Sequence, residues 1–199
     1  MVVEQTLVRA ENKLNSKLSV VYARKLRALF PSKIAICVEI GNSALSQGIN
    51  PILAISIALH ETEFQNITSI PCSNALKKRL KRSPTPSELN ACPQGPLQAV
   101  PYYMCPNHSA FDCNLVSAGL EAILRFSNLI SKTHGILDPY DVSYCLAFEQ
   151  ECGNLLAKYN RGIKGEFKKG RSEYSNYALP ILETYKFILS SLEDISPTC

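Results

Sequence analysis

The strongest chemical feature of this sequence is a carboxyl group at the end of an apolar segment. The stretch ILAISIALH, residues 52–60, is followed directly by Glu61. A helix that delivers a carboxyl group from an apolar interior places it in partly desolvated surroundings, which raises its pKa toward the range of a general acid. Cleavage of a glycosidic bond requires such an acid. Glu61 is therefore the candidate catalytic residue, although a glutamate at a helix end is also typical of an ordinary surface.

The neighbours of Glu61 argue against two other kinds of site. His60 begins the string HETEF, which lacks the second histidine that a zinc-binding HExxH motif needs one turn later. Glu63 lies two positions after Glu61, so on a helix it points to another side and is a poor second carboxylate. We therefore expect a single acidic group in the site.

The segment that carries Glu61 is expected to be a helix in the middle of the core. Asn50 supplies a capping side chain and Pro51 suits the first turn, after which the helix is apolar on every side. Further helices are predicted at 3–29, 32–45, 114–134, 139–160 with a possible break at Gly153, and 173–192 with a bend or restart at Pro180.

The middle of the chain has a different pattern. Residues 65–106 are rich in proline and contain few long apolar stretches, which predicts loops with one short helix around 73–81. Alternation typical of strands is scarce throughout. The sequence therefore predicts an all-α fold, or an α fold with a small hairpin in these loops.

Size and composition favour one soluble domain with its own core. The chain has 199 residues, 46% hydrophobic and 19% charged, and no apolar run long enough to span a membrane. The first residues, MVVEQTLVRAENKLNSK, lack the apolar stretch of a signal peptide, so work outside the cytoplasm would require another route of delivery.

Much of the net charge of +4 comes from two basic runs, residues 77–82 and 161–171. We interpret these runs as solvated surface, with the carboxylates and phosphates of a bacterial wall as an alternative partner. Nucleic acid is not expected, because no nucleic-acid-binding motif accompanies them.

Eight cysteines leave three hypotheses open. They are Cys37, Cys72, Cys92, Cys105, Cys113, Cys145, Cys152 and Cys199. Reduced cysteines can serve as small apolar core residues, or disulfides can form, most plausibly among the four between 72 and 113. Zinc is the third hypothesis, with Cys92, Cys105, His108 and Cys113 as ligands, although their spacing fits no standard finger. Cys145 and Cys152 would lie about 10 Å apart along a continuous helix, so we expect no bridge between them.

Several motifs resemble those of lytic transglycosylases and goose-type lysozymes. INPILAISIALHETEF is similar to the segment in which an apolar helix ends in Glu-Ser, with Thr62 where serine is common. QGPLQAVP resembles the Gly-Leu-Met-Gln motif, NLVSAGLEAILRF the helix that follows it, and LLAKYNRG the Ala-Tyr-Asn-Ala-Gly motif. Tyr177 in SNYALPILETY resembles the tyrosine of the closing helix. The motifs cover residues 48–188 in the order of the family.

The resemblance implies a lysozyme-like helical domain with a catalytic cleft over residues 48–199. It implies a cysteine-containing insertion at about 65–94, and N-terminal helices in 1–47 that pack on this domain or extend it. Glu61 would be the general acid and base. The implied substrate-binding residues are Thr62, Gln98, Tyr159, Asn160 and Tyr177. No cofactor or metal is implied.

The implied reaction is cleavage of the β-1,4 bond between N-acetylmuramic acid and N-acetylglucosamine in peptidoglycan. Glu61 would protonate the leaving oxygen and then help the 6-hydroxyl of the sugar to attack the anomeric carbon, which leaves a 1,6-anhydro end. Two alternatives stay open. One is attack by water, as in goose-type lysozyme, and the other is that the protein is a non-catalytic component of a virion or a wall-binding protein with the same fold. The implied partners are glycan strands and a virion or secretion machine. The protein would be virion-associated in a phage, or released to the periplasm or cell wall.

This chain departs from the family pattern at three places. Pro96-Leu97 replaces the usual Leu-Met, Arg161 follows Asn160 where a small residue is usual, and the serine that usually precedes the glycine motif has no clear counterpart. We therefore expect a substrate preference that differs from that of cell-wall recyclers.

Overall fold

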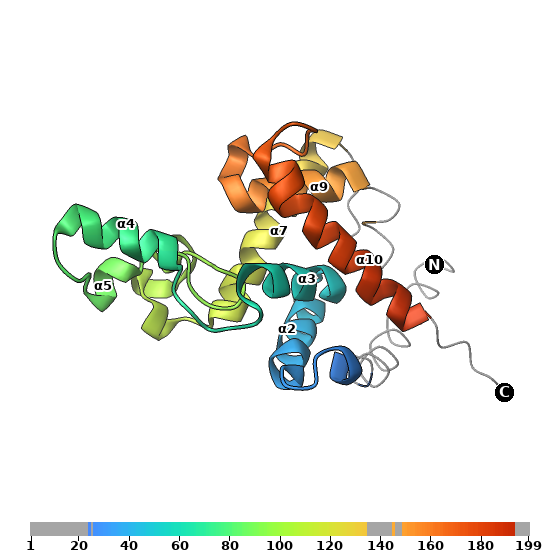
Figure 1. The fold of residues 1–199 in the computed structure, drawn as a ribbon, viewed down its shortest axis with the longest axis horizontal. Coiled ribbons are helices and arrows are strands. Elements are labelled where there is room, and N and C mark those ends of the chain that lie inside the picture. The colour runs from blue at the N-terminus through green and yellow to red at the C-terminus, as the bar shows by residue number, and fades with distance from the viewer. Residues whose placement is uncertain (1–23, 25, 135–144, 146–148, 194–199) are drawn as a thin grey trace, which may run out of the picture.

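The chain folds into helices packed around one central helix, in a computed structural model that describes residues 24, 26–134, 145 and 149–193 (Figure 1). The longer helices are α2 (Ile34–Ser46), α3 (Pro51–Thr62), α4 (Ile70–Leu80), α7 (Leu115–His134), α9 (Glu149–Arg161) and α10 (Leu179–Glu193). Shorter pieces are α5 (Pro86–Leu89), α6 (Pro101–Met104), 3₁₀ turns at Pro106–His108, Ala110–Asp112 and Gly162–Lys164, and a π-helical turn at Tyr174–Ala178.

The predicted all-α class is confirmed. Within the described residues there is no regular strand, and the alternative of a small hairpin reduces to two isolated β-bridges, Thr68 with Gln94 and Gln94 with Ala99. Of the first predicted helix, only residues 24 and 26–29 are described, and these are helical. The predicted helix start at 138–139 lies outside the described residues. In the described part of the chain, no helix is both long and apolar enough to cross a membrane.

Helix α3 forms the centre of the core, as predicted. The side-chain oxygen of Asn50 accepts hydrogen bonds from the backbone N–H groups of Ile52 and Leu53, at 2.9 and 3.2 Å, and Pro51 occupies the first turn. All eight residues from 51 to 58 are buried. Asn50 also donates to the hydroxyl of Tyr185 on α10 at 3.1 Å, so the cap joins α3 to the C-terminal helix.

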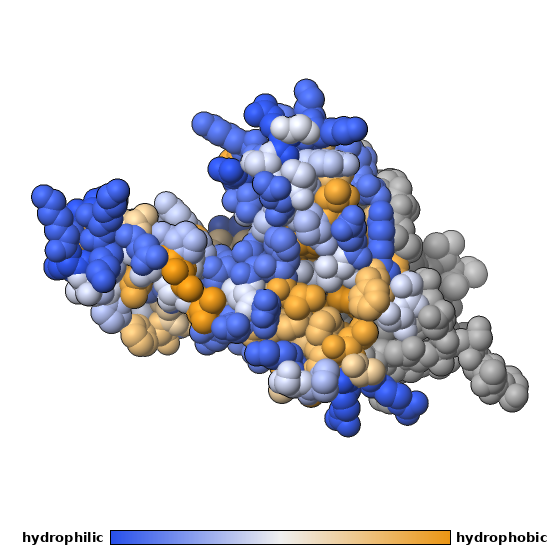
Figure 2. Space-filling view, in the orientation of Figure 1, coloured by the Kyte–Doolittle hydropathy of each residue, from blue (hydrophilic) through white to orange (hydrophobic). Residues whose placement is uncertain are grey.

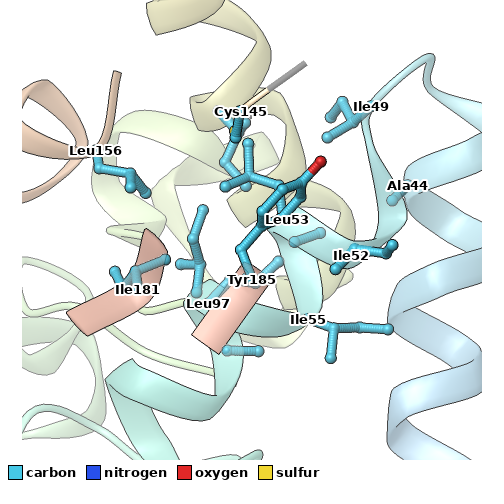
Figure 3. Close-up of a cluster of buried hydrophobic side chains, with 14 of the residues drawn as sticks. Ala44, Ile49, Ile52, Leu53, Ile55, Leu97, Cys145, Leu156, Ile181 and Tyr185 are labelled. Atoms are coloured by element: carbon cyan, nitrogen blue, oxygen red, sulfur yellow. The ribbon is translucent and has the colours of Figure 1, made fainter. Parts of the chain in front are cut away.

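Helices α2 and α10 pack on α3, with α7 behind it in the view of Figure 1. The core combines segments that are far apart in the chain (Figure 3). Its buried side chains include Ala44, Ile49, Ile52, Leu53, Ile55, Leu97, Cys145, Leu156, Ile181 and Tyr185. Cys37 is also buried there as a free thiol, and burial raises its pKa to about 12. The hypothesis of a reduced core cysteine therefore holds for Cys37.

Helices α4 and α5 form an arm that projects away from this core, and the arm has a hydrophilic outer end (Figures 1 and 2). Among the residues of α4, only Leu76 is buried. A disulfide joins Cys72 to Cys92 with a Cα–Cα distance of 5.7 Å. At the tip, Glu88 forms a capping box with Thr85 and accepts two bonds from the Arg82 guanidinium at 2.6 and 2.8 Å. The arm coincides with most of the expected insertion at 65–94.

The predicted short helix at 73–81 is longer in the structure, and α5 and α6 were not predicted. Each of these three helices has a proline at its first or second position. Proline is tolerated there because the first N–H groups of a helix have no partner inside it. Three of the prolines that we interpreted as signs of loops, Pro71, Pro86 and Pro101, therefore begin helices.

The expectation that Cys145 and Cys152 are not joined is wrong. The structure joins them by a disulfide, with their Cα atoms 5.3 Å apart instead of the distance of about 10 Å along a continuous helix. Cys152 lies in α9, and a Cα–Cα distance of 5.3 Å means that Cys145 and Cys152 do not lie on one continuous helix. The possible break at Gly153 is also wrong, because Gly153 lies inside α9.

Candidate functional site

Glu61 lies in the last turn of α3, half-buried, where the chain leaves the core toward the arm. Its carboxylate oxygen Oε1 accepts a hydrogen bond from the hydroxyl of Tyr177. Burial raises the pKa of Glu61 above its ordinary value, and the bond from Tyr177 acts in the opposite direction. The site therefore holds a carboxyl group that retains its proton to higher pH than an exposed glutamate does.

Tyr177 reaches Glu61 from the π-helical turn that precedes α10. Pro180 follows this turn, and proline has no N–H group to bond the carbonyl four residues earlier, which is a reason for the wider turn there. The Tyr177 side chain is buried, and the His60 ring packs edge-on against it at 5.1 Å between centroids. Partial burial lowers the pKa of His60. Burial, and then the nearby Glu61, raise the pKa of the Tyr177 hydroxyl, so it remains a proton donor.

Tyr159 on α9 is the third member of this cluster. Its hydroxyl donates a hydrogen bond to the backbone carbonyl oxygen of Leu97, and its ring lies edge-on to Phe126 at 6.5 Å. Burial, followed by the charge of Glu61, raises the pKa of Tyr159. Two phenols that stay protonated at neutral pH therefore lie near one carboxyl group, and one of them, Tyr177, is hydrogen-bonded to it.

The turn Gly95–Gln98 fixes the position of Leu97. The N–H of Gln98 bonds the carbonyl of Gly95 at 3.1 Å, and Gly95 has a φ of +78°, which favours glycine. Leu97 is fully buried against Gly119 of α7, where an added Cβ would come within 2.3 Å of the Leu97 Cβ. Pro96-Leu97 therefore fits this turn, despite the departure from Leu-Met.

Thr62 connects Glu61 to the same turn. Its side chain is buried, and its hydroxyl donates to the carbonyl of Pro96 at 3.1 Å. The contact makes Thr62 a residue that positions the turn beside Glu61. The role of Thr62 in binding substrate stays a prediction.

A cavity of about 860 Å³ adjoins the cluster, and Tyr159 and Gln98 contribute to its wall. The Gln98 amide donates to the backbone carbonyls of Ile67 and Gly95, at 3.0 and 2.9 Å, which holds this side chain at the edge of the cavity. Asn160 is exposed at the end of α9. Glu61, Tyr177 and Asn160 do not line this cavity. Tyr159 connects the cavity to the cluster of Glu61 and Tyr177.

Glu63 does not complete a pair of catalytic carboxylates. It is exposed, ends α3 in the left-handed region with a φ of 52°, and lines a separate cavity of about 530 Å³ together with His60. Burial and Tyr177 account for the shifted pKa of Glu61, without a contribution from any other described carboxylate. The chemistry available here is proton donation and proton acceptance by one carboxyl group.

The disulfide bonds of the structure contradict the zinc hypothesis. Disulfides join Cys72 to Cys92 and Cys105 to Cys113, which leaves no thiolate among the four to bind a metal. No group of three or more metal-binding side chains was found in the described part of the chain. The disulfide hypothesis is therefore the one that these four cysteines support.

The sequence did not identify all parts of the site. It gave no indication of the packing of His60 on Tyr177, or of the Leu97 carbonyl that accepts from Tyr159, because these contacts join segments far apart in the chain. The glycine at 119 was a usable signal, since a glycine inside a helix indicates a close neighbour.

Comparisons of the chain with models of protein families, with curated proteins and with solved structures gave no match.

Proposed function

We propose that this protein cleaves the glycan strands of peptidoglycan, in the manner of a lytic transglycosylase, with Glu61 as the only acid and base. The observation that carries the proposal is the half-buried Glu61 carboxyl, which has a raised pKa and accepts a hydrogen bond from Tyr177. The resemblance of the surrounding motifs to those of lytic transglycosylases supports the choice of substrate.

The proposed reaction uses this one group twice. Protonated Glu61 donates its proton to the oxygen of the β-1,4 bond as that bond breaks. The resulting carboxylate then takes the proton from the 6-hydroxyl of the N-acetylmuramic acid while this oxygen bonds to the anomeric carbon. Proton and charge balance, and Glu61 ends protonated as it began. Most glycosidases need a second carboxylate for the second step, whereas here the substrate supplies the nucleophile.

Tyr177 has a defined part in this cycle. Its hydroxyl stabilises the ionised form of Glu61, which the proposed cycle forms between the two proton transfers. Burial acts against that form and raises the pKa of the carboxyl. A group that acts first as an acid and then as a base needs both effects, because burial favours its protonated form and the hydrogen bond from Tyr177 favours its ionised form.

Mass spectrometry of purified peptidoglycan digested with the protein tests the proposal. New 1,6-anhydro ends are the expected products. New reducing ends would mean attack by water, as in goose-type lysozyme, and absence of products would overturn the proposal.

Glu61→Gln is the matching variant, and Glu63→Gln is its control on the same helix end. We expect Glu61→Gln to lower the rate by 10⁴ or more, at or beyond the upper end of what a general acid contributes. Glu63→Gln should keep most of the activity, because Glu63 is exposed and faces another cavity. An equal loss in both variants would assign the chemistry to the wrong carboxylate.

A further inference from the structure

The cavity beside Tyr159 has an unusual combination of lining residues. Its charged residues are Arg125, Arg161 and Lys164, and no acidic residue lines it. The remaining lining residues are mostly apolar: Ala99, Val100, Tyr103, Met104, Ala122, Phe126, Leu129, Tyr159, Gly162 and Ile163, with Gln98 at the edge. A ligand that fits this cavity has apolar groups and carries negative charge.

Two of the cations are presented by a turn that the fold holds in place. Gly162 has a φ of +69°, and Lys158 donates to the carbonyls of Ile163 and Gly165, at 2.9 and 3.3 Å. An added Cβ on Gly165 would come within 2.0 Å of the carbonyl oxygen of Ala157, so this turn lies directly against α9. The positions of Arg161 and Lys164 are therefore built into the fold.

The charge of these cations is only partly neutralised. Arg125 pairs closely with Glu121 at 2.5 Å. Arg161 approaches Glu173 only to 3.8 Å and donates a long hydrogen bond of 3.4 Å to the Ser172 hydroxyl. No acid among the described residues pairs with Lys164. The guanidinium of Arg161 is exposed, and a pair held at 3.8 Å is weak, so it is readily exchanged for a ligand carboxylate. Arg161 and Lys164 are thus the groups most available to an anionic ligand.

We propose that this cavity binds the stem peptide that branches from the glycan strand, with Arg161 and Lys164 contacting its carboxylates. The inference rests on the proposed function, because Tyr159 belongs both to the cavity and to the surroundings of Glu61. Stem peptides are short, combine alanine methyl groups with free carboxylates, and leave the strand at the N-acetylmuramic acid next to the cleaved bond. Arg161 stands where the related motif has a small residue, so this contact would be a property of this chain.

Direct binding tests the inference without any need for activity. The probe is a fluorescently labelled stem tetrapeptide released from peptidoglycan by an amidase, and its anisotropy is followed with the full-length protein. We expect saturable binding that weakens about tenfold for the same peptide with its carboxylates amidated. The double variant Arg161→Gln with Lys164→Gln should weaken binding of the unmodified peptide to a similar degree. Lys78→Gln on the arm, an exposed lysine outside the cavity, is the control and should leave binding unchanged.

Kinetics on two substrates separate this inference from the proposed function. We expect the wild-type KM to be several-fold lower for peptide-bearing strands than for strands stripped of peptides, and the double variant to bring this ratio close to one. Cleavage of both substrates with equal KM, or tetrapeptide binding that is unaffected by the double variant, overturns the inference and leaves the proposed function intact. Specific tetrapeptide binding without any cleavage would overturn the proposed function and leave a peptide-binding cavity.

Discussion

The hydroxyl of Tyr177 donates a hydrogen bond to the carboxylate of Glu61, across 116 residues of sequence. The bond lowers the pKa of a group that burial raises, so the two effects set the pH range in which Glu61 is a useful acid. Because the bond reaches Glu61 from the C-terminal half of the chain, it can be removed without disturbing α3.

Tyr177→Phe should raise the pKa of Glu61 further, because it deletes the interaction that favours the ionised form. A general acid acts only while protonated, so the alkaline limb of the kcat/KM profile should move to higher pH. The maximal rate should fall roughly tenfold, since the carboxylate formed between the two proton transfers loses its partner. Tyr174→Phe, on the same π-helical turn, is the control and should leave the limb in place. A limb that moves to lower pH would contradict the assigned role of Tyr177.

Glu61→Gln should change how the stability of the protein depends on pH. The pKa of Glu61 is raised in the folded state, so its contribution is fully present below its ordinary value of 4.5 and is lost as the pH rises through the folded-state pKa. The neutral glutamine has no such loss. Urea unfolding of both proteins between about pH 4 and about pH 8 should therefore show the variant gaining stability relative to the wild type as the pH rises. A constant difference would mean that Glu61 is not desolvated.

Gly119→Ala should destabilise the fold even though alanine favours helices by about 1 kcal/mol over glycine. The new Cβ would come within 2.3 Å of the Leu97 Cβ, which is a clash inside a packed core and costs typically about 1–3 kcal/mol or more. Denaturation in urea measures the difference. Asn128→Ala, at an exposed position of the same helix, should instead raise stability by a few tenths of a kcal/mol, roughly the propensity difference. An unchanged or higher stability in Gly119→Ala would exclude the close approach of α7 to Leu97.

Replacing Cys72 and Cys92 together by serine should loosen the arm more than the core. The bridge spans 20 residues of sequence, and α4 buries only Leu76. The arm therefore has little apolar burial to hold it closed without the disulfide. Trypsin should then cut faster within residues 77–82, as mass spectrometry of a limited digest would show. Replacing Cys105 and Cys113 by serine is the control and should leave the rate of cutting within 77–82 unchanged. If the wild-type protein is cut there as fast as the Cys72 and Cys92 variant, the prediction is wrong.

The parts of the fold that could be predicted from the sequence are those determined locally. The Asn50 cap, the apolar helix after it and the helix beginning near 115 follow from short-range patterns, and the structure confirms them. The helices of the arm were under-predicted, because proline has the same local signature in a loop and in the first turn of a helix. The bridge between Cys145 and Cys152 was wrongly excluded, since the reasoning assumed one continuous helix through both.

The candidate site was only partly predictable, for a different reason. Glu61 has a local signature, but Tyr159 and Tyr177 were selected through the resemblance to lytic transglycosylases. Their approach to Glu61 depends on how α9 and α10 pack around α3, which no local pattern determines. Arg161 and Lys164 were recognised as part of the basic run 161–171, but their meeting with Arg125 of α7 in one cavity could not be predicted for the same reason.

The separation of Glu61 from Tyr177 along the chain also has a consequence for protein synthesis. A ribosome completes α3 well before it reaches the π-helical turn and α10, which together bury Tyr177 and cover α3. Until then the Glu61 carboxyl lacks the hydrogen bond from Tyr177. If Glu61 is the acid that cleaves the wall, we expect a chain that ends before residue 174 to be inactive, because it lacks Tyr177 and the helix α10 that packs on α3.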